Sequence, residues 1–263
     1  MCLRAVGFAL FLLAVPPDAE ATGDEDLVVL GERVYRKACE PCHGRQGDGT
    51  GSIARWLDPL PRDFTLGTFK FRSTMSGSVP TDEDLRRTVD RGIPGNSMPS
   101  WQHLLAVGER DAVVAYIKTF SDWFEDGVYP EDIVVTDAQL ATPPPPTEEM
   151  LAAGREVYAR MECAKCHGED GRGNPDNPLE DDYGRRIVAF DFTTGVYKAG
   201  SDPPDVYRSF ATGLDSTPMP SYADSLDETE RWQLVYYCLS LSRRTTVRDW
   251  LLHPPLWNHR MQR

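Results

Sequence analysis

The motif C-x-x-C-H occurs twice in this sequence, and each copy belongs to a longer repeat. GERVY at 31–35 precedes CEPCHGRQGDGTG, and GREVY at 154–158 precedes CAKCHGEDGRGN. Further segments repeat at nearly the same offset: DFTLG at 63–67 as DFTTG at 191–195, and RGIPGNSMPSW at 91–101 as TGLDSTPMPSY at 212–222. Self-similarity at this length indicates two copies of one structural unit in tandem.

The boundaries of the two units follow from the repeat and from a change in composition between the copies. We expect domain 1 at residues 24–125 and domain 2 at residues 148–244, with a C-terminal tail at 245–263 that belongs to neither repeat. The segment between them, 126–147, contains ATPPPPT. Four consecutive prolines cannot form a helix or an inner strand, so this segment is predicted to be an extended, semi-rigid linker.

The first 21 residues have the pattern of a secretory signal peptide. Arg4 provides a positive charge, residues 5–15 (AVGFALFLLAV) are apolar, and residues 19–21 (AEA) form an A-x-A cleavage site. The apolar stretch is much shorter than the roughly 20 residues that span a bilayer. We therefore expect a periplasmic protein, exported with cleavage of residues 1–21, whose mature chain has no transmembrane anchor.

The formal net charge of −13 makes nucleic acids and anionic membrane surfaces poor partners. We expect redox proteins with basic docking patches as partners. A generally solvated acidic surface explains the same charge.

Helical periodicity dominates both copies, without alternating β-branched runs. Apolar residues recur at helical spacing before the first motif, and the closing segments at 108–120 and 229–241 show the same pattern. Thr81 and Asp84 resemble a capping box before a helix that Gly92 ends. In the second copy, Asp202 is the expected cap, with Pro203 at the first helical position and Gly213 at the end.

Three chemistries compete for the two C-x-x-C-H motifs. A thioredoxin-like dithiol requires a preceding strand, and a structural zinc site requires two C-x-x-C pairs about 15 to 20 residues apart. Neither copy has such a strand, and the two pairs lie in separate repeats, 124 residues apart. Covalent haem attachment also explains the histidine. On a helix, positions i, i+3 and i+4 share a face, so two thioether cysteines and an iron-ligating imidazole can address one porphyrin.

The sequence therefore predicts two covalently attached haem c groups. One is held by Cys39, Cys42 and His43, and the other by Cys163, Cys166 and His167. Haem attachment is also compatible with export. Free thiols would form disulfides in an oxidising compartment, and thioether formation consumes these thiols first.

Each haem iron needs a second axial ligand, and two methionines occupy equivalent places in the repeats. Met98 and Met219 each lie in an M-P-S-aromatic context just after a helix that glycine ends. A single methionine is more often core filler, but the equivalent placement favours ligation of iron by both. Thioether ligation raises the reduction potential and leaves no open site for a substrate.

The chain resembles a tandem class I cytochrome c through its two haem motifs, its two MPS segments and the Gly31/Tyr35 and Gly154/Tyr158 helices. The resemblance implies an all-α fold around each haem, with those helices crossing the closing helices. It also implies that the protein is an electron carrier and has no catalytic residues. We expect it to relay single electrons between redox partners of a respiratory chain. The alternative is a catalytic or enzyme-bound diheme subunit, such as a thiosulfate dehydrogenase, a peroxidase or the electron-transfer subunit of a larger oxidoreductase.

The remaining candidates concern the haem surroundings. Haem propionates are expected to pair with cations near each motif, where bidentate arginine is well suited; the candidates are Arg62, Lys70, Arg72 and Lys198. In this family a loop proline supplies the carbonyl that fixes the ligating histidine ring, a role that falls to Pro59 or Pro61. Pro175 and Pro178 fit the second copy less well. Trp101 and Tyr222 are expected to wall the haem pockets. Cys238 aligns with Ile117, which favours a small buried residue over the axial cysteine that thiosulfate dehydrogenases use.

Overall fold

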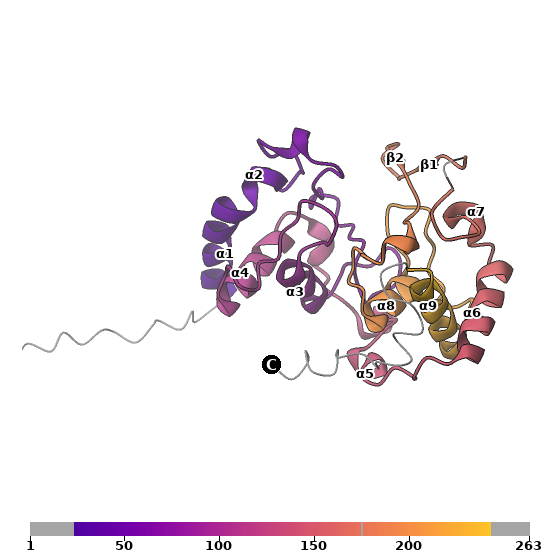
Figure 1. Cartoon of the computed structure of the whole chain (residues 1–263). Helices are drawn as coiled ribbons and strands as arrows, with labels where there is room; N and C mark the ends of the chain where they lie inside the picture. The colour runs from indigo at the N-terminus through magenta and orange to yellow at the C-terminus, as the bar shows by residue number, and fades with distance from the viewer. Residues whose placement is uncertain (1–23, 175, 243–263) are drawn as a thin grey trace, which may run out of the picture.

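The computed structural model describes residues 24–174 and 176–242 and consists of two helical lobes, one for each repeat (Figure 1). The first lobe contains α1 (Asp24–Ala38), α2 (Glu40–His43), the 3-10 turn η1 (Ala54–Trp56), α3 (Asp82–Arg91) and α4 (Val107–Lys118). The second contains α6 (Glu148–Arg160), α7 (Ala164–His167), β1 (Leu179–Glu180), β2 (Arg186–Ile187), the 3-10 turn η4 (Phe192–Thr194), α8 (Pro203–Thr212) and α9 (Glu228–Ser240). Helices dominate both lobes, and the short antiparallel pair β1–β2 is the one sheet in the described residues. The prediction of an all-α fold is confirmed.

Two glycines let the first and last helices of each lobe cross in contact. A Cβ placed on Gly31 in α1 would lie 2.0 Å from the carbonyl oxygen of Ala112 in α4. The equivalent Cβ on Gly154 in α6 would lie 2.1 Å from the carbonyl oxygen of Gln233 in α9. Since neither distance leaves room for a methyl group, the helix backbones touch at the glycines.

The helices that precede the two MPS segments begin and end mainly as the sequence predicts. Thr81 and Asp84 form a reciprocal capping box at the start of α3. Gly92 ends α3 with φ 65°, and Gly213 ends α8 with φ 69°. Asp202 does occupy the N-cap of α8, but its side chain makes no capping hydrogen bond there. Pro203 at the first helical position instead fixes the backbone angle with which this helix starts.

Each lobe has its own hydrophobic core. In domain 1, Tyr35 from α1 packs against Tyr116 and Phe120, with ring centroids 5.3 and 5.1 Å away. In domain 2, Trp232 of α9 packs on Tyr207 of α8 at 4.4 Å. Two separate cores are what a duplicated domain requires.

The linker differs from the extended spacer that its prolines predict. It contains η3 (Pro130–Asp132) and α5 (Asp137–Leu140), and Val135 and Leu140 are buried in the core of domain 2, whereas η2 (Asp122–Phe124) belongs to the end of domain 1. The linker backbone also bonds to domain 1, where the Ser73 carbonyl accepts from the amide of Val134 at 2.9 Å. The prolines at 143–146 do lack regular structure. The apolar residues before them, rather than the prolines, determine how the linker packs.

The two lobes meet through α3 and α8, which are equivalent helices of the repeat (Figure 1). Asp84 and Arg87 form an ion pair on α3, and Asp205 and Arg208 form the matching pair on α8. Both arginines also pair with Asp137 of the linker, at 3.4 and 3.0 Å. The interface is therefore approximately two-fold, with the linker carboxylate between the two arginines.

Two predictions concern residues that the structure does not describe. The signal peptide at 1–21 and the tail at 245–263 both lie outside the described ranges. Within those ranges, no helix has the length and apolar character needed to cross a bilayer.

Candidate haem sites

Both C-x-x-C-H motifs fold as a single helical turn. In α2, the Cys39 carbonyl accepts from the amides of Cys42 and His43, at 3.1 and 2.9 Å. In α7, the Cys163 carbonyl accepts from the amides of Cys166 and His167, at 3.2 and 2.9 Å. All four motif cysteines are free of disulfides. The turn gives each motif the i, i+3, i+4 placement that thioether attachment and iron ligation require.

The thiols are poorly suited to dithiol redox chemistry. Burial raises the pKa of Cys39 to about 12 and that of Cys163 to about 11. A reactive dithiol needs a lowered pKa, because the thiolate is the nucleophile. This environment fits cysteines consumed as thioethers better than a thioredoxin-like pair.

A backbone carbonyl orients each ligating histidine. Nδ1 of His43 donates to the Arg62 carbonyl oxygen at 3.0 Å, and Nδ1 of His167 donates to the Phe190 carbonyl oxygen at 3.1 Å. The proton is therefore on Nδ1, which leaves Nε2 free to bind iron. Burial lowers the pKa of both histidines, so the neutral, ligating form is favoured.

The expectation that a proline supplies this carbonyl is wrong in both copies. In the first copy the acceptor is Arg62, one residue after Pro61. In the second copy it is Phe190, which the repeat aligns with Arg62, rather than a proline of the 175–178 loop. The acceptor is set by backbone position, which a residue type does not reveal.

The loop after each motif is tied to the first helix. The Tyr35 hydroxyl donates to the Gly44 carbonyl at 2.7 Å, and the Tyr158 hydroxyl donates to the Gly168 carbonyl at 2.7 Å. Gly44 has φ 79° and Gly168 has φ 75°, a left-handed conformation that glycine adopts without strain. These bonds hold the residue after each histidine in place and so support the ligand itself.

The MPS segments return to the same side of each domain as the motif. Tyr222 is buried and lies within hydrogen-bonding reach of Cys163, and both pack in one core with Met219. In domain 1, Trp101 packs against the same core as Cys39, and its buried Nε1 has no hydrogen-bond partner among the described residues. A buried, unpaired donor beside a haem motif fits a haem group with acceptor oxygens. The donor set and this orphaned N–H both fit covalently bound haem.

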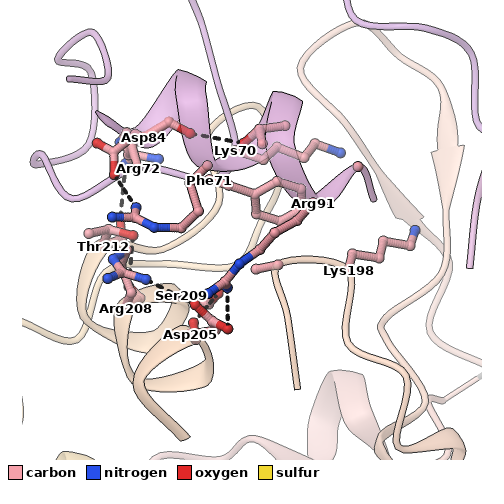
Figure 2. A pocket seen from close by; sticks show the side chains of 14 residues that line it. Lys70, Phe71, Arg72, Asp84, Arg91, Lys198, Asp205, Arg208, Ser209 and Thr212 are labelled. Carbon is pink, nitrogen blue, oxygen red and sulfur yellow. Dashed lines mark hydrogen bonds and ion pairs between the residues drawn. The ribbon is translucent and has the colours of Figure 1, made fainter. Parts of the chain in front are cut away.

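The cations predicted to bind propionates do not form one set. Figure 2 shows Lys70 and Lys198, from different domains, extending to the same side of a small cavity between the lobes. Arg62 acts electrostatically on Lys70 as well. Arg72 lines the same cavity, but it is 0% exposed, pairs with Asp215 at 2.8 Å and donates to the backbone carbonyls of Met75, Phe69 and Thr212. Its guanidinium is occupied, so we do not retain it as a propionate partner.

Comparisons with known proteins match both halves of the chain. Residues 27–117 match the family "Cytochrome C oxidase, cbb3-type, subunit III", and residues 151–242 match the family "Cytochrome c". A chain in the solved structure of the Kuenenia stuttgartiensis reducing HAO-like protein complex Kustc0457/Kustc0458 is 46% identical, with a TM-score of 0.75. That similarity covers 81% of this chain and 96% of the other. The chain is a tandem diheme cytochrome c.

Two curated relatives are more distant. Subunit FixP of a cbb3-type cytochrome c oxidase from Azorhizobium caulinodans is 25% identical over 212 residues, which cover 80% of this chain and 58% of FixP. Subunit CcoP from Rubrivivax gelatinosus is 25% identical over 247 residues, which cover 93% of this chain and 64% of CcoP. This diheme cytochrome therefore spans less than two thirds of the length of either curated relative.

As a diheme cytochrome c, the protein carries two covalently bound haem c groups. The bound haem supplies an iron that gains and loses one electron. Two cysteines of each motif would attach one porphyrin, and the Nδ1 hydrogen bond of each histidine leaves its Nε2 free to ligate that iron. Cys238 is 1% exposed within α9, which agrees with a small buried packing residue.

Sequence reasoning missed the contacts between the domains. Arg72, Asp84, Asp205 and Arg208 are all buried at the interface. The repeat does contain a signal for them, because Asp84 and Arg87 recur as Asp205 and Arg208 at one offset. A buried aspartate paired with an arginine at the same place in both copies indicates a shared structural role.

Proposed function

We propose that this cytochrome relays single electrons between redox proteins of a respiratory chain outside the cytoplasm, with both irons six-coordinate. His43 and Met98 would ligate one iron, and His167 and Met219 the other. The observation that carries the proposal is the equivalent placement of each MPS segment on its helix. The Trp101 amide donates to the Val89 carbonyl of α3 at 3.1 Å, and the Tyr222 amide donates to the Phe210 carbonyl of α8 at 3.0 Å.

Six-coordination suits a carrier for a physical reason. When both axial positions are filled by protein groups, oxygen and peroxide have no vacancy on the iron, and one-electron exchange remains. The buried pockets also lower the local dielectric constant around each iron. Such an environment favours electron transfer over chemistry on a bound substrate.

We further propose that Arg62, Lys70 and Lys198 neutralise haem propionates between the domains. Burial, together with the neighbouring cations Arg62 and Lys198, lowers the pKa of Lys70 to about 8. Asp181 acts in the opposite direction and Arg185 adds to the lowering. Cations gathered close enough to lower the pKa of Lys70 create an excess of positive potential, which propionate carboxylates would balance.

A second candidate is supported by the comparisons: a subunit of a larger oxidoreductase. The 46% identical chain comes from a complex with an HAO-like protein, and the curated relatives are oxidase subunits by name. The exported location rests on the sequence of residues 1–21. An assembled carrier and a freely diffusing one would use the same two haem sites.

The ligand assignment is tested with Met98→Ala and Met219→Ala in the full mature protein. Each variant is expected to lower one of two reduction potentials, to lose about half of the methionine–iron charge-transfer absorbance and to open one haem to added imidazole. Met150→Ala is a matched control, because Met150 lies in α6 against the core of domain 2. Unchanged spectra and potentials in both ligand variants would refute the assignment.

The two candidate functions are separated by the native mass of the cytochrome in extracts of the source cells. Co-migration with an enzyme through gel filtration at physiological salt supports the subunit. A free protein of one chain's mass, reduced and oxidised by separate soluble partners, supports the diffusing carrier.

A further inference from the structure

The turns that carry Met98 and Met219 have the same hydrogen bonds but different sequences. In domain 1, the Ile93 carbonyl accepts from the Asn96 amide at 3.2 Å, and the Ile93 amide donates to the Met98 carbonyl at 3.0 Å. In domain 2, the Leu214 carbonyl accepts from the Thr217 amide at 3.1 Å, and the Leu214 amide donates to the Met219 carbonyl at 3.1 Å. Each domain thus makes one four-residue turn before its methionine.

The central residues of the two turns differ in what they contribute by themselves. Domain 1 has Pro94 followed by Gly95, which has φ 78°. Proline at the second position and glycine at the third are the residues that a turn with a left-handed third residue prefers. Domain 2 has Asp215 followed by Ser216, which has φ 62°. A serine in this region is strained, so the second turn needs support from outside.

That support comes from domain 1. Nη2 of Arg72 lies 2.8 Å from Oδ1 of Asp215 and donates to the Thr212 carbonyl at 2.9 Å. The Gly77 amide donates to Oδ2 of Asp215 at 3.4 Å, so the carboxylate is held from two sides. Figure 2 shows Arg72 reaching from its own domain toward Thr212.

The strained serine has its own partners. Oγ of Ser216 donates to Oγ1 of Thr68 in domain 1 at 3.3 Å, and the Tyr183 hydroxyl lies 3.1 Å from the same Oγ. Tyr183 and Thr68 bond to each other at 2.9 Å, which closes a ring of three hydroxyl groups. Ser216 is buried, whereas the glycine in the equivalent position of domain 1 is exposed.

Arg72 is fixed before it reaches across the interface. Its Nε donates to the Met75 carbonyl at 3.1 Å, and Nη1 donates to the Phe69 carbonyl at 3.2 Å. The side chain is fully buried, so solvent does not screen its pair with Asp215. Within the described ranges, residues 93–98 make no hydrogen bond or ion pair to domain 2. Among the described residues, domain 1 therefore supports the methionine turn of domain 2, but domain 2 does not support that of domain 1.

We propose that domain 1 positions the methionine of domain 2, with Arg72 and Thr68 holding the turn 214–217 so that Met219 meets its iron. The inference rests on the proposed function, because it takes Met219 as the sixth ligand. It makes Arg72 a positioning residue that acts through Asp215. The potential of the second haem then depends on the contact between the domains, whereas the Pro-Gly turn makes the first haem independent of it.

The test compares Arg72→Gln with a variant that restores the turn by other means. Loss of the charge-assisted bond is expected to raise the imidazole affinity of one haem about tenfold, equivalent to about 1.4 kcal/mol. The reduction potential of that haem should fall. The triple variant Arg72→Gln/Asp215→Pro/Ser216→Gly copies the turn of domain 1 and is expected to return both quantities to wild type.

The control is Arg91→Gln, which removes the ion pair between Arg91 and Asp205 across the same interface. It does not touch residues 213–219 and should leave the second haem unchanged. In a Met219→Ala background, Arg72→Gln should add no further effect. If Arg72→Gln does not fold, Thr68→Val tests the same turn, with Ser216→Gly as its restoring change.

Three results would overturn the proposal. Arg72→Gln could leave both haems as in wild type while Met219→Ala opens one. The Arg91→Gln control could reproduce the Arg72→Gln effect. The triple variant could also fail to restore ligation. Either result would show that the variants loosen the contact between the two domains in general, rather than the turn 214–217. Unchanged spectra in Met219→Ala itself would instead refute the ligand assignment, and with it this inference.

Discussion

Replacing Gly31 with alanine should separate the two long helices of domain 1. The new Cβ would lie 2.0 Å from the Ala112 carbonyl oxygen and 2.8 Å from Cβ of Tyr116, so α1 and α4 must move apart by about 1 Å to reach 3.0 Å. The obstacle is backbone, which cannot rotate away. Overpacking of this kind costs about 3 kcal/mol, and the better helix propensity of alanine offsets up to about 1 kcal/mol. We expect a net destabilisation of about 2 kcal/mol.

The matched control is Gly108→Ala, because Gly108 lies in α4 of the same domain with nothing within 4 Å of its Cβ position. This change keeps the propensity gain without the clash and should stabilise domain 1 by about 0.5 kcal/mol. Urea unfolding of the holoprotein, followed by helical circular dichroism and the Soret band, measures both. With a urea m-value of about 2 kcal/mol/M, Gly31→Ala shifts the midpoint down by about 1 M. Equal midpoints for the two variants would refute the helix-contact argument.

Three further predictions follow from buried and exposed polar groups. Asp84→Asn should lower the free energy of unfolding by about 3 kcal/mol, because this carboxylate is 2% exposed and bonds to two backbone amides and an arginine. As a comparison, Asp137→Asn changes a side chain that is 69% exposed and should lower it by under about 1 kcal/mol in the same urea assay. Tyr35→Phe loses one buried hydrogen bond and should lower the stability of domain 1 by about 1 kcal/mol; a change no larger than that of an exposed tyrosine would contradict this. Because burial lowers the pKa values of His43 and His167 from 6.5, the unfolded chain takes up protons first, and the urea midpoint should fall as pH drops through 6.5; a midpoint that rises there would contradict the sign.

The sequence predicted the parts of each haem site that depend on spacing along the chain. The C-x-x-C-H turn, the capping box at Thr81 and the glycine ends of α3 and α8 are local, so residue identity is enough to place them. The histidine acceptor and the role of Arg72 were not predictable in this way. Both depend on which backbone carbonyls a loop brings close, and Arg72 bonds mainly to carbonyls and to a residue 143 positions away. The packing of the linker was not predicted, because the interpretation relied on its prolines and gave no weight to the apolar residues before them, Val135 and Leu140.

The two copies have diverged in a complementary way where they touch. The repeat aligns Arg72 with Gly200 and Arg91 with Thr212, so domain 1 provides both arginines and domain 2 has neither. A Cβ on Gly200 would lie 2.2 Å from Oδ2 of Asp205 and 3.1 Å from Nη1 of Arg91, which shows that the Arg91 pair needs this glycine.

In a pair of two domain 1 copies, Arg72 of one copy would face Arg91 of the other. Two cations would then lie close together in a low-dielectric interface. A pair of two domain 2 copies would have neither arginine and would leave Asp205 and Asp215 without their partners across the interface. Unpaired buried charges cost several kcal/mol, so both like pairings are disfavoured relative to the tandem arrangement. The same substitutions that make domain 1 and domain 2 fit each other therefore prevent either from pairing with itself, and they keep Arg72 against the turn that carries Met219.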